Sequence, residues 1–286
     1  MKDFKPVFII GTGRCGSQLF YRMIAHHRSF RWYTRMENVY PDSKLVKSIS
    51  TILSKPSFYK VLDPRVQPAE PYPHFKKADP GFVNPCRSLR AEDLTSKKRK
   101  KLRKLVKEKA GKKRFLTKIT GWSMIQYLDN AFPKSKFIHI LRDGRAVANS
   151  LMHVDFWEGW EGIHNWRWGY KDEYTEEIEK YDNSFAAVAA LQWKLITKEI
   201  NRSKEKISPD RFLEVKYEDL VKNPVGVVKE SVEFTDETWS KSMDKIVGSY
   251  RTKNMNFKWK KNLSSKDKEI LQDSLKETLI EYGYKI

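Results

Sequence analysis

Residues 7–19, with the sequence VFIIGTGRCGSQL, restrict the fold more than any other part of this chain. The four consecutive apolar residues at the start predict a strand buried on both faces, as is typical of a parallel sheet. The turn that follows contains Gly11, Gly13 and Gly16, and glycine tolerates positive φ angles. A helix is predicted to begin at Ser17. A strand, a glycine-rich turn and a helix in this order predict an α/β fold whose turn holds an anion at the helix N-terminus.

The turn indicates a phosphate-like ligand without triphosphate hydrolysis. Nucleoside triphosphatases carry GxxxxGK[ST], whereas this chain has GTGRCGSQ, so Ser17 stands where the lysine would be. Arg14 supplies a cation inside the loop, and a guanidinium suits bidentate contact with a tetrahedral oxyanion. The alternative is a glycine-rich turn that only packs a strand on a helix.

A second unit of the same design covers residues 136–152, with the sequence KFIHILRDGRAVANSLM. It predicts a strand over 137–141, a turn and a helix. Arg142 follows the strand, and Ser150 lies two turns into the helix. The carboxyl ends of parallel strands meet at one edge of a sheet, so we expect Arg142 and Ser150 to bind a second phosphate beside the first. The alternative is that Arg142 only pairs with Asp143 at the helix start.

These two units resemble the PAPS-dependent sulfotransferases. RCGSQL is similar to the family's 5′-phosphosulfate loop, and RDGRAVANS is similar to its 3′-phosphate motif, with arginine and serine eight positions apart. The resemblance implies a mainly parallel central sheet flanked by helices, with a P-loop nucleotide-kinase-like architecture. It also implies 3′-phosphoadenosine 5′-phosphosulfate (PAPS) as donor and 3′-phosphoadenosine 5′-phosphate (PAP) as product. Gln18 departs from the family, which usually has a hydroxyl residue there. The implied nucleotide contacts from the two motifs are Gly13, Arg14, Cys15, Gly16, Ser17, Gln18, Arg142 and Ser150.

Three further segments resemble the family in its own order. FLTKITG at 115–121 resembles the strand that ends in a lysine before the acceptor site. FLEVKYEDLVKNP at 212–224 resembles the strand and turn near the adenine, and KWKKNLS at 258–264 resembles the basic C-terminal loop over the nucleotide. The implied nucleotide contacts from the last two segments are Tyr217, Lys258, Trp259 and Lys260.

The resemblance places Lys118 beside the transferring group, where an ammonium would stabilise charge on the leaving oxygen. The alternative is a strand-end lysine paired with Asp129 or another carboxylate. Many relatives carry an acidic residue after the first helix, and Glu37 is its nearest match, which implies a general base for the acceptor hydroxyl. The alternatives are an ion pair of Glu37 with Arg31 or Arg35 and, for the base, His74. The predicted catalytic residues are Arg14, Lys118 and Glu37.

The predicted reaction is transfer of a sulfuryl group from PAPS to a hydroxyl of a carbohydrate, lipid, small molecule or peptide. An in-line displacement needs positioning and fixed charge, so we expect no metal. One rival is a nucleotide-dependent kinase, which would need the missing loop lysine and a magnesium site. The other is a basic nucleic-acid- or membrane-binding protein on a degenerate nucleotide fold, in which Arg142 and Ser150 would have no role.

The net charge of +20 arises largely from residues 97–114, which carry twelve lysines and arginines and one glutamate. Leu102, Leu105 and Val106 recur at helical spacing, which predicts a helix with a thin apolar stripe. Its basic side is either a solvated face or a surface that attracts a polyanionic acceptor or an anionic membrane. Nucleic acid is the least favoured partner.

The length of 286 residues suffices for one sizeable core. We expect a single domain over residues 1–286, with a proline-rich and basic insertion at about 56–113 that resembles no part of the family. The chain has two cysteines, no signal peptide and no run of roughly 18 apolar residues. We therefore expect a soluble cytoplasmic protein, complete as written because Met1 and Lys2 lead directly into the first strand.

Overall fold

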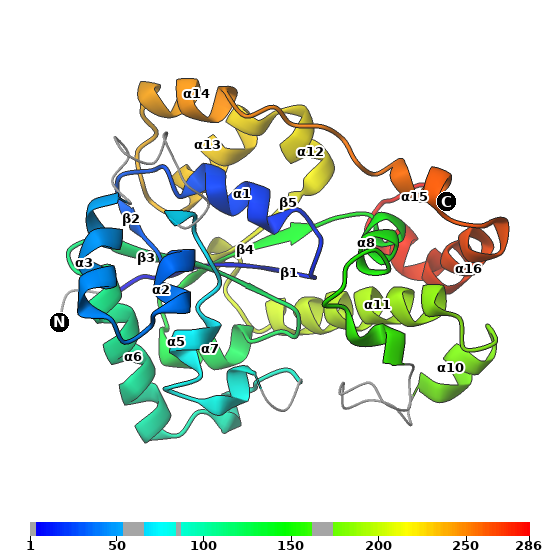
Figure 1. The fold of residues 1–286 in the computed structure, drawn as a ribbon, viewed down its shortest axis with the longest axis horizontal. Coiled ribbons are helices and arrows are strands. Elements are labelled where there is room, and N and C mark those ends of the chain that lie inside the picture. Colours follow the sequence, from blue (N-terminus) through cyan, green and yellow to red (C-terminus); the bar gives the residue numbers. More distant parts are fainter. Residues whose placement is uncertain (1–3, 54–65, 84–86, 162–173) are drawn as a thin grey trace.

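Five parallel strands form the central sheet, in the order β2-β3-β1-β4-β5 (Figure 1). The computed structural model describes residues 4–53, 66–83, 87–161 and 174–286. The predicted mainly parallel α/β fold is confirmed, and so are the two predicted strand-turn-helix units. The strands are β1 (Val7–Gly11), β2 (Phe30–Arg31), β3 (Arg114–Thr120), β4 (Lys136–Leu141) and β5 (Phe212–Lys216).

Helices cover both faces of the sheet because successive side chains of a strand point to opposite faces. Val7 and Ile9 of β1 pack in a core with α1, α13 and α14. Phe8 and Ile10 pack in another core with α6, α7 and α11, across the sheet (Figure 1). The helices of these two layers are α1 (Ser17–Ile24), α6 (Ser96–Ala110), α7 (Ile125–Ala131), α11 (Phe185–Lys204), α13 (Pro224–Phe234) and α14 (Lys241–Gly248).

A third core supports the helix that follows β4. This helix, α8 (Gly144–Leu151), packs against α11 and α16 (Ser265–Glu281). Gly144 permits a close approach, because a Cβ atom there would lie 2.6 Å from Cε3 of Trp193. The packing fixes α8, and therefore Ser150, relative to the sheet.

Short helices complete the described structure, and the proline-rich region contributes to its core. Residues 56–65 and 84–86 of the predicted insertion lie outside the described residues, whereas Phe75 and Phe82 pack in the same core as Phe8. That the chain forms one domain with an insertion stays a prediction. Within the described ranges, no helix is both long and apolar enough to cross a membrane. The remaining helices are α2 (Arg35–Val39), α3 (Lys44–Leu53), α5 (Tyr72–Phe75), α10 (Thr175–Glu179), α12 (Tyr217–Lys222), α15 (Lys258–Asn262) and the 3₁₀ helices Pro80–Phe82, Ala91–Asp93, Glu158–Glu161 and Pro209–Arg211.

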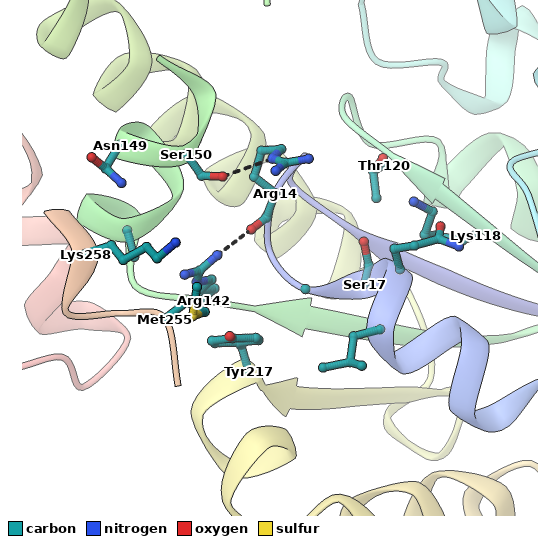
Figure 2. Close-up of a pocket in the computed structure, with 14 residues that line it drawn as sticks. Arg14, Ser17, Lys118, Thr120, Arg142, Asn149, Ser150, Tyr217, Met255 and Lys258 are labelled. Atoms are coloured by element: carbon teal, nitrogen blue, oxygen red, sulfur yellow. Dashed lines mark hydrogen bonds between the residues drawn. The ribbon is translucent and has the colours of Figure 1, made fainter. Parts of the chain in front are cut away.

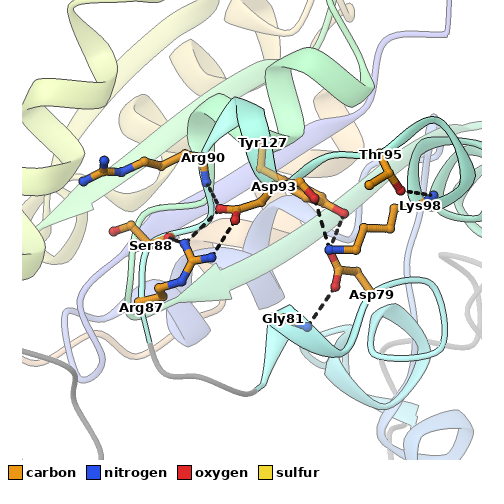
Figure 3. A network of polar contacts seen from close by, with 9 residues as sticks. All are labelled: Asp79, Gly81, Arg87, Ser88, Arg90, Asp93, Thr95, Lys98 and Tyr127. Carbon is orange, nitrogen blue, oxygen red and sulfur yellow. Dashed lines mark hydrogen bonds and ion pairs between the residues drawn. The ribbon is translucent and has the colours of Figure 1, made fainter.

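The basic helix α6 is anchored at its first turn by a polar network (Figure 3). Lys98 Nζ lies 2.9 Å from Oδ2 of the buried Asp79, and the Tyr127 hydroxyl donates to the same oxygen at 2.7 Å. Arg87 pairs with Asp93 and lowers the pKa of that carboxyl to about 2. Lys98 is therefore a structural residue and does not belong to a freely solvated face.

The rest of α6 follows the predicted pattern in part. Leu102, Val106 and Ala110 are buried against the sheet, and Leu105 is half-buried. The basic side chains that do face solvent are Lys97, Lys100, Lys101, Arg103, Lys104 and Lys107.

Candidate functional site

A cleft of about 400 Å³ lies where β1, β3, β4 and β5 end (Figure 2). Parallel α/β sheets bind ligands at this edge. Segments far apart in the sequence meet here, from the loop after β1 to the first residue of α15. The predicted site residues that line the cleft are Arg14, Gly16, Ser17, Gln18, Lys118, Arg142, Ser150, Tyr217 and Lys258.

The loop after β1 has a different backbone from the one its glycines suggest. Gly16 has φ 92°, and a Cβ atom there would lie 2.4 Å from Cδ2 of Tyr217. Gly13 does not adopt a positive φ and does not line the cleft; Arg14 takes the left-handed conformation instead, with φ 66°. A non-glycine residue in this region is strained, which is a common property of binding sites.

This loop forms a cradle suited to an anion. The N-cap of α1 is Gly16, which offers no side chain to the N–H groups of the first helical turn. These N–H groups and the helix dipole favour a negative charge. Cys15 is fully buried below the loop and does not line the cleft, and burial raises the pKa of its thiol. The Cys15 side chain therefore acts as a packing group and not as an anion ligand.

Arg142 connects the two motifs. Its Nη1 donates to the backbone oxygen of Arg14 at 2.9 Å, its Nε donates to Oδ1 of Asn256 at 2.9 Å, and its Cζ lies 4.4 Å from the centre of the Tyr217 ring. Arg14 Nε in turn donates to the Ser150 hydroxyl at 3.0 Å. These contacts hold two guanidinium groups at the carboxyl ends of β1 and β4 (Figure 2).

The structure does not support the alternative in which Arg142 only pairs with Asp143 at the start of α8. The ion pair with Asp143 is made by Arg145, whose Nη2 lies 2.8 Å from the Asp143 carboxylate. Asn256 was not predicted as a site residue. It also donates to the Glu218 carboxylate, so the C-terminal segment holds Arg142 from one side.

The predicted C-terminal contacts are only partly brought to the cleft. Lys258 lines it, and the Tyr217 hydroxyl donates to the backbone oxygen of Lys253 at 3.1 Å. Trp259 is buried with its ring 4.9 Å from Cζ of Arg145, which is away from the cleft. Lys260 does not line the cleft either, and its Nζ lies 5.6 Å from the Trp259 ring. The indole of Trp259 packs in the third core, and this apolar packing determines the position of Trp259.

Lys118 lies on the opposite side of the cleft, in β3. Its Nζ is 3.4 Å from Oε1 of Glu70. Asp129 pairs with Arg211, but the alternative in which another carboxylate pairs with Lys118 agrees with the contact to Glu70. Glu70 also accepts hydrogen bonds from the backbone N–H and the hydroxyl of Thr120, another cleft residue. Glu70 is therefore a carboxylate in contact with two residues of the cleft, and it was not predicted from the sequence.

Glu37, the predicted base, does not line the cleft. Glu37 forms a capping box with Thr34 at the start of α2 and is buried. Lys109 Nζ lies 2.6 and 2.7 Å from its two carboxylate oxygens. Arg31, one of the arginines considered, also interacts with the Glu37 charge, which opposes the lowering of the Arg31 pKa by burial. The Glu37 carboxylate therefore serves to cap α2 and to pair with Lys109.

His74, the alternative base, is also a packing residue. Its ring stacks on Tyr33 with centroids 3.8 Å apart, and burial lowers the pKa of His74 to about 4. It does not line the cleft. Neither of the bases considered from the sequence therefore lines the cleft.

The charge of the cleft determines what it can bind. Among the described residues that line it, Arg14, Lys118, Arg142 and Lys258 are cationic and none is a carboxylate. Fixed cations in a partly desolvated cleft attract a polyanion and stabilise charge that develops on a leaving oxygen. Within the described ranges, no cluster of three histidine, cysteine or acidic side chains could hold a metal ion. The arrangement suits a ligand with phosphate-like groups at two points.

Solved structures with the same fold are sulfotransferases. STF9 from Mycobacterium avium matches with a TM-score of 0.62 at 14% identity, over 100% of this chain and 79% of that chain. STF1 from Mycobacterium tuberculosis matches with a TM-score of 0.54 at 12% identity, over 94% of this chain and 77% of that one. At these identities the likeness establishes the shared fold.

A curated relative matches a shorter part of the sequence. It is the omega-hydroxy-beta-dihydromenaquinone-9 sulfotransferase Stf3 of Mycobacterium bovis, 30% identical over 105 residues. The match covers 37% of this chain and 24% of Stf3, so it spans about a quarter of the relative's length. The family model described as "Sulfotransferase family" matches residues 6–241, which include both cationic motifs and Lys118. The resemblance drawn from the motifs is thus confirmed across most of the sequence, and the chain belongs to the sulfotransferase family.

Proposed function

We propose that this protein transfers a sulfuryl group from PAPS to an acceptor hydroxyl. The observation that carries the proposal is the meeting of Arg14, Lys118, Arg142 and Ser150 in one cleft. Family membership defines the class of reaction and does not favour the kinase or the binding-protein alternative.

The donor would lie across the carboxyl edge of the sheet. The loop after β1 and the N-terminus of α1 would bind the 5′-phosphosulfate, with Arg14 as counter-ion. Arg142, Ser150 and Lys258 would bind the 3′-phosphate, and the Tyr217 ring would lie near the adenine. A donor with two phosphate groups would explain why two arginines are held at this edge.

In the proposed reaction the acceptor oxygen attacks sulfur. A new S–O bond forms while the S–O bond to the 5′-phosphate of the donor breaks, which leaves PAP. Lys118 would stabilise the negative charge that develops on that leaving oxygen. Glu70, in place of Glu37, would accept the proton of the hydroxyl, because it lies beside Lys118 and Thr120. No metal is part of this proposal, since the fixed cations supply the charge.

We propose an apolar molecule as the acceptor. The name of Stf3 describes a hydroxylated quinone as the compound on which that relative acts. In this chain the exposed Phe156 ring lies 6.0 Å from Cζ of Arg14, so an apolar surface adjoins the cation of the 5′ loop. A cytoplasmic location is also proposed, supported by the free thiol of Cys15.

The test is binding followed by transfer. PAP should raise the melting temperature of the protein, and ATP at the same concentration should raise it much less. Incubation with PAPS and a panel of apolar and polar alcohols should then add the mass of one sulfuryl group to an acceptor. A shift with ATP alone, or with oligonucleotides alone, would contradict the proposal.

Replacing Arg142 by alanine should weaken PAP binding by about 1.5 to 3 kcal/mol, because a buried charged donor to the 3′-phosphate is lost. AMP lacks that phosphate, so its affinity should change much less. Titration calorimetry with both nucleotides measures the difference. Equal losses for PAP and AMP would assign Arg142 to the scaffold of the loop.

A further inference from the structure

An apolar surface is exposed at the end of the molecule formed by α2 and α3. Leu45, Ile49 and Ile52 of α3 are 70%, 38% and 51% exposed, and their spacing of four and three residues places them on one side of the helix. Val39 and Tyr40, which precede α3, are exposed as well. We call these five residues the α3 ridge. Single exposed apolar residues are common on proteins, but a contiguous group marks an interaction site.

Helix α3 carries aliphatic side chains on its outer side as well as on its inner side. Its fully buried residue is Ser50, whose hydroxyl lies 3.0 Å from the Thr34 hydroxyl at the start of α2. Val46 and Leu53 are half-buried on the same side as Ser50, whereas Leu45, Ile49 and Ile52 lie on the outer side of the helix. A helix usually buries its apolar stripe against the core, so packing within the described structure does not explain the α3 ridge.

The surroundings of the α3 ridge are basic. Lys44 and Lys47 are exposed on α3 itself, and Arg35 is exposed on α2. The exposed Asp42 lies between the two helices and is paired with Lys77. α6, with its six exposed lysines and arginines, lies at the same end of the molecule as α3 (Figure 1). The partner of this end therefore has an apolar part and a negative charge.

We propose that the α3 ridge docks on an anionic lipid surface. The aliphatic side chains and Tyr40 would enter the boundary between headgroups and acyl chains, as in other amphipathic interfacial helices. Lys44, Lys47 and the exposed face of α6 would contact lipid phosphates, which attract basic residues near the surface. A nucleic acid would complement the positive charge but would not bury the aliphatic side chains. An anionic bilayer satisfies both, and the proposal requires no spanning helix.

The end of the molecule that carries the α3 ridge adjoins the side of the cleft where Lys118 lies. Asn38, next to the α3 ridge, donates from Nδ2 to the backbone oxygen of Glu70 at 2.8 Å. Glu70 contacts Lys118. Membrane docking does not depend on the proposed reaction, but it would bring the segment that carries Glu70 toward the lipid surface.

Sedimentation with lipid vesicles tests the proposal. The wild-type protein should co-sediment with vesicles of phosphatidylcholine and phosphatidylglycerol, and less with phosphatidylcholine alone. The double variant Leu45→Glu, Ile49→Glu should lower the partition coefficient at least about tenfold, because two inserted side chains are lost. Lys44→Gln with Lys47→Gln should weaken binding only to the anionic vesicles. The matched control is Ile280→Glu, an equally exposed aliphatic residue on α16 at the opposite end (Figure 1), which should bind like the wild type.

Three results would overturn the proposal: no binding of the wild type, unchanged binding of the double variant, or an equal loss in the Ile280→Glu control. A dimer in light scattering that the double variant dissociates would assign the α3 ridge to a second copy of the chain instead. The melting temperature of each variant checks that it is folded. The shift caused by PAP is a separate measurement, so the failure of nucleotide binding and the failure of membrane docking can be told apart.

Discussion

Replacing Lys118 by alanine is expected to lower kcat about a hundredfold or more while PAP still binds and the fold stays intact. Lys118 lies in β3 on the side of the cleft opposite Arg142, where a bridging oxygen of the donor would lie. Its ammonium would interact most strongly when that oxygen gains charge in the transition state. The loss should therefore appear in kcat, with little change in KM. Steady-state kinetics with saturating PAPS measure it.

Two further variants separate catalysis from structure at this position. Glu70→Gln keeps the shape of the neighbour and removes its basicity, so kcat should fall here as well. Lys136→Ala is the matched control: Lys136 is also a strand lysine paired with a carboxylate, Asp236 at 2.7 Å, but it does not line the cleft. It should leave kcat unchanged. Unchanged turnover in Lys118→Ala, together with a lower melting temperature, would make Lys118 a structural counter-ion of Glu70.

Replacing Lys109 by alanine is expected to destabilise the protein by about 3–5 kcal/mol, because the variant leaves a buried carboxylate without its cation. The side chains of Glu37 and Lys109 are only 1% and 8% exposed. The other hydrogen bonds of Glu37 come from the backbone N–H and hydroxyl of Thr34, and neither carries a charge. The midpoint of urea unfolding measures the change.

The control for this prediction is an ion pair on the same helix. Lys104 pairs with Glu108 at 3.8 Å, and both are exposed, so Lys104→Ala should change stability by less than about 0.5 kcal/mol. Glu37→Gln distinguishes the structural from the catalytic assignment. We expect lower stability and an unchanged kcat in the folded enzyme. The opposite result, a large loss of kcat at unchanged stability, would return Glu37 to the role of general base.

The sequence alone determined the parallel sheet and the two strand-turn-helix units. Each depends on local chemistry: consecutive apolar residues that need burial, a turn rich in glycine or opened by aspartate, and a helix that follows at once. Because parallel strands end at one edge of the sheet, the succession of strand, turn and helix in each unit was sufficient to bring Arg14, Arg142 and Ser150 together. The motifs also located Lys118, Tyr217 and Lys258 at this edge, and each lines the cleft.

Only the tertiary structure decided which carboxylate adjoins the cleft and which basic residues pair with a carboxylate. Glu37 and Glu70 look alike in the sequence, but one is neutralised by Lys109, 72 positions away, and the other meets Lys118 across 48 positions. Lys98 likewise stands among similar lysines and is distinguished only by the buried Asp79. Burial makes an unpaired charge costly, so the buried Glu37 and Asp79 each take the cation that the folded chain brings within reach, and the half-buried Glu70 meets Lys118 in the same way. That choice depends on distances between segments, and no local pattern of residues encodes them.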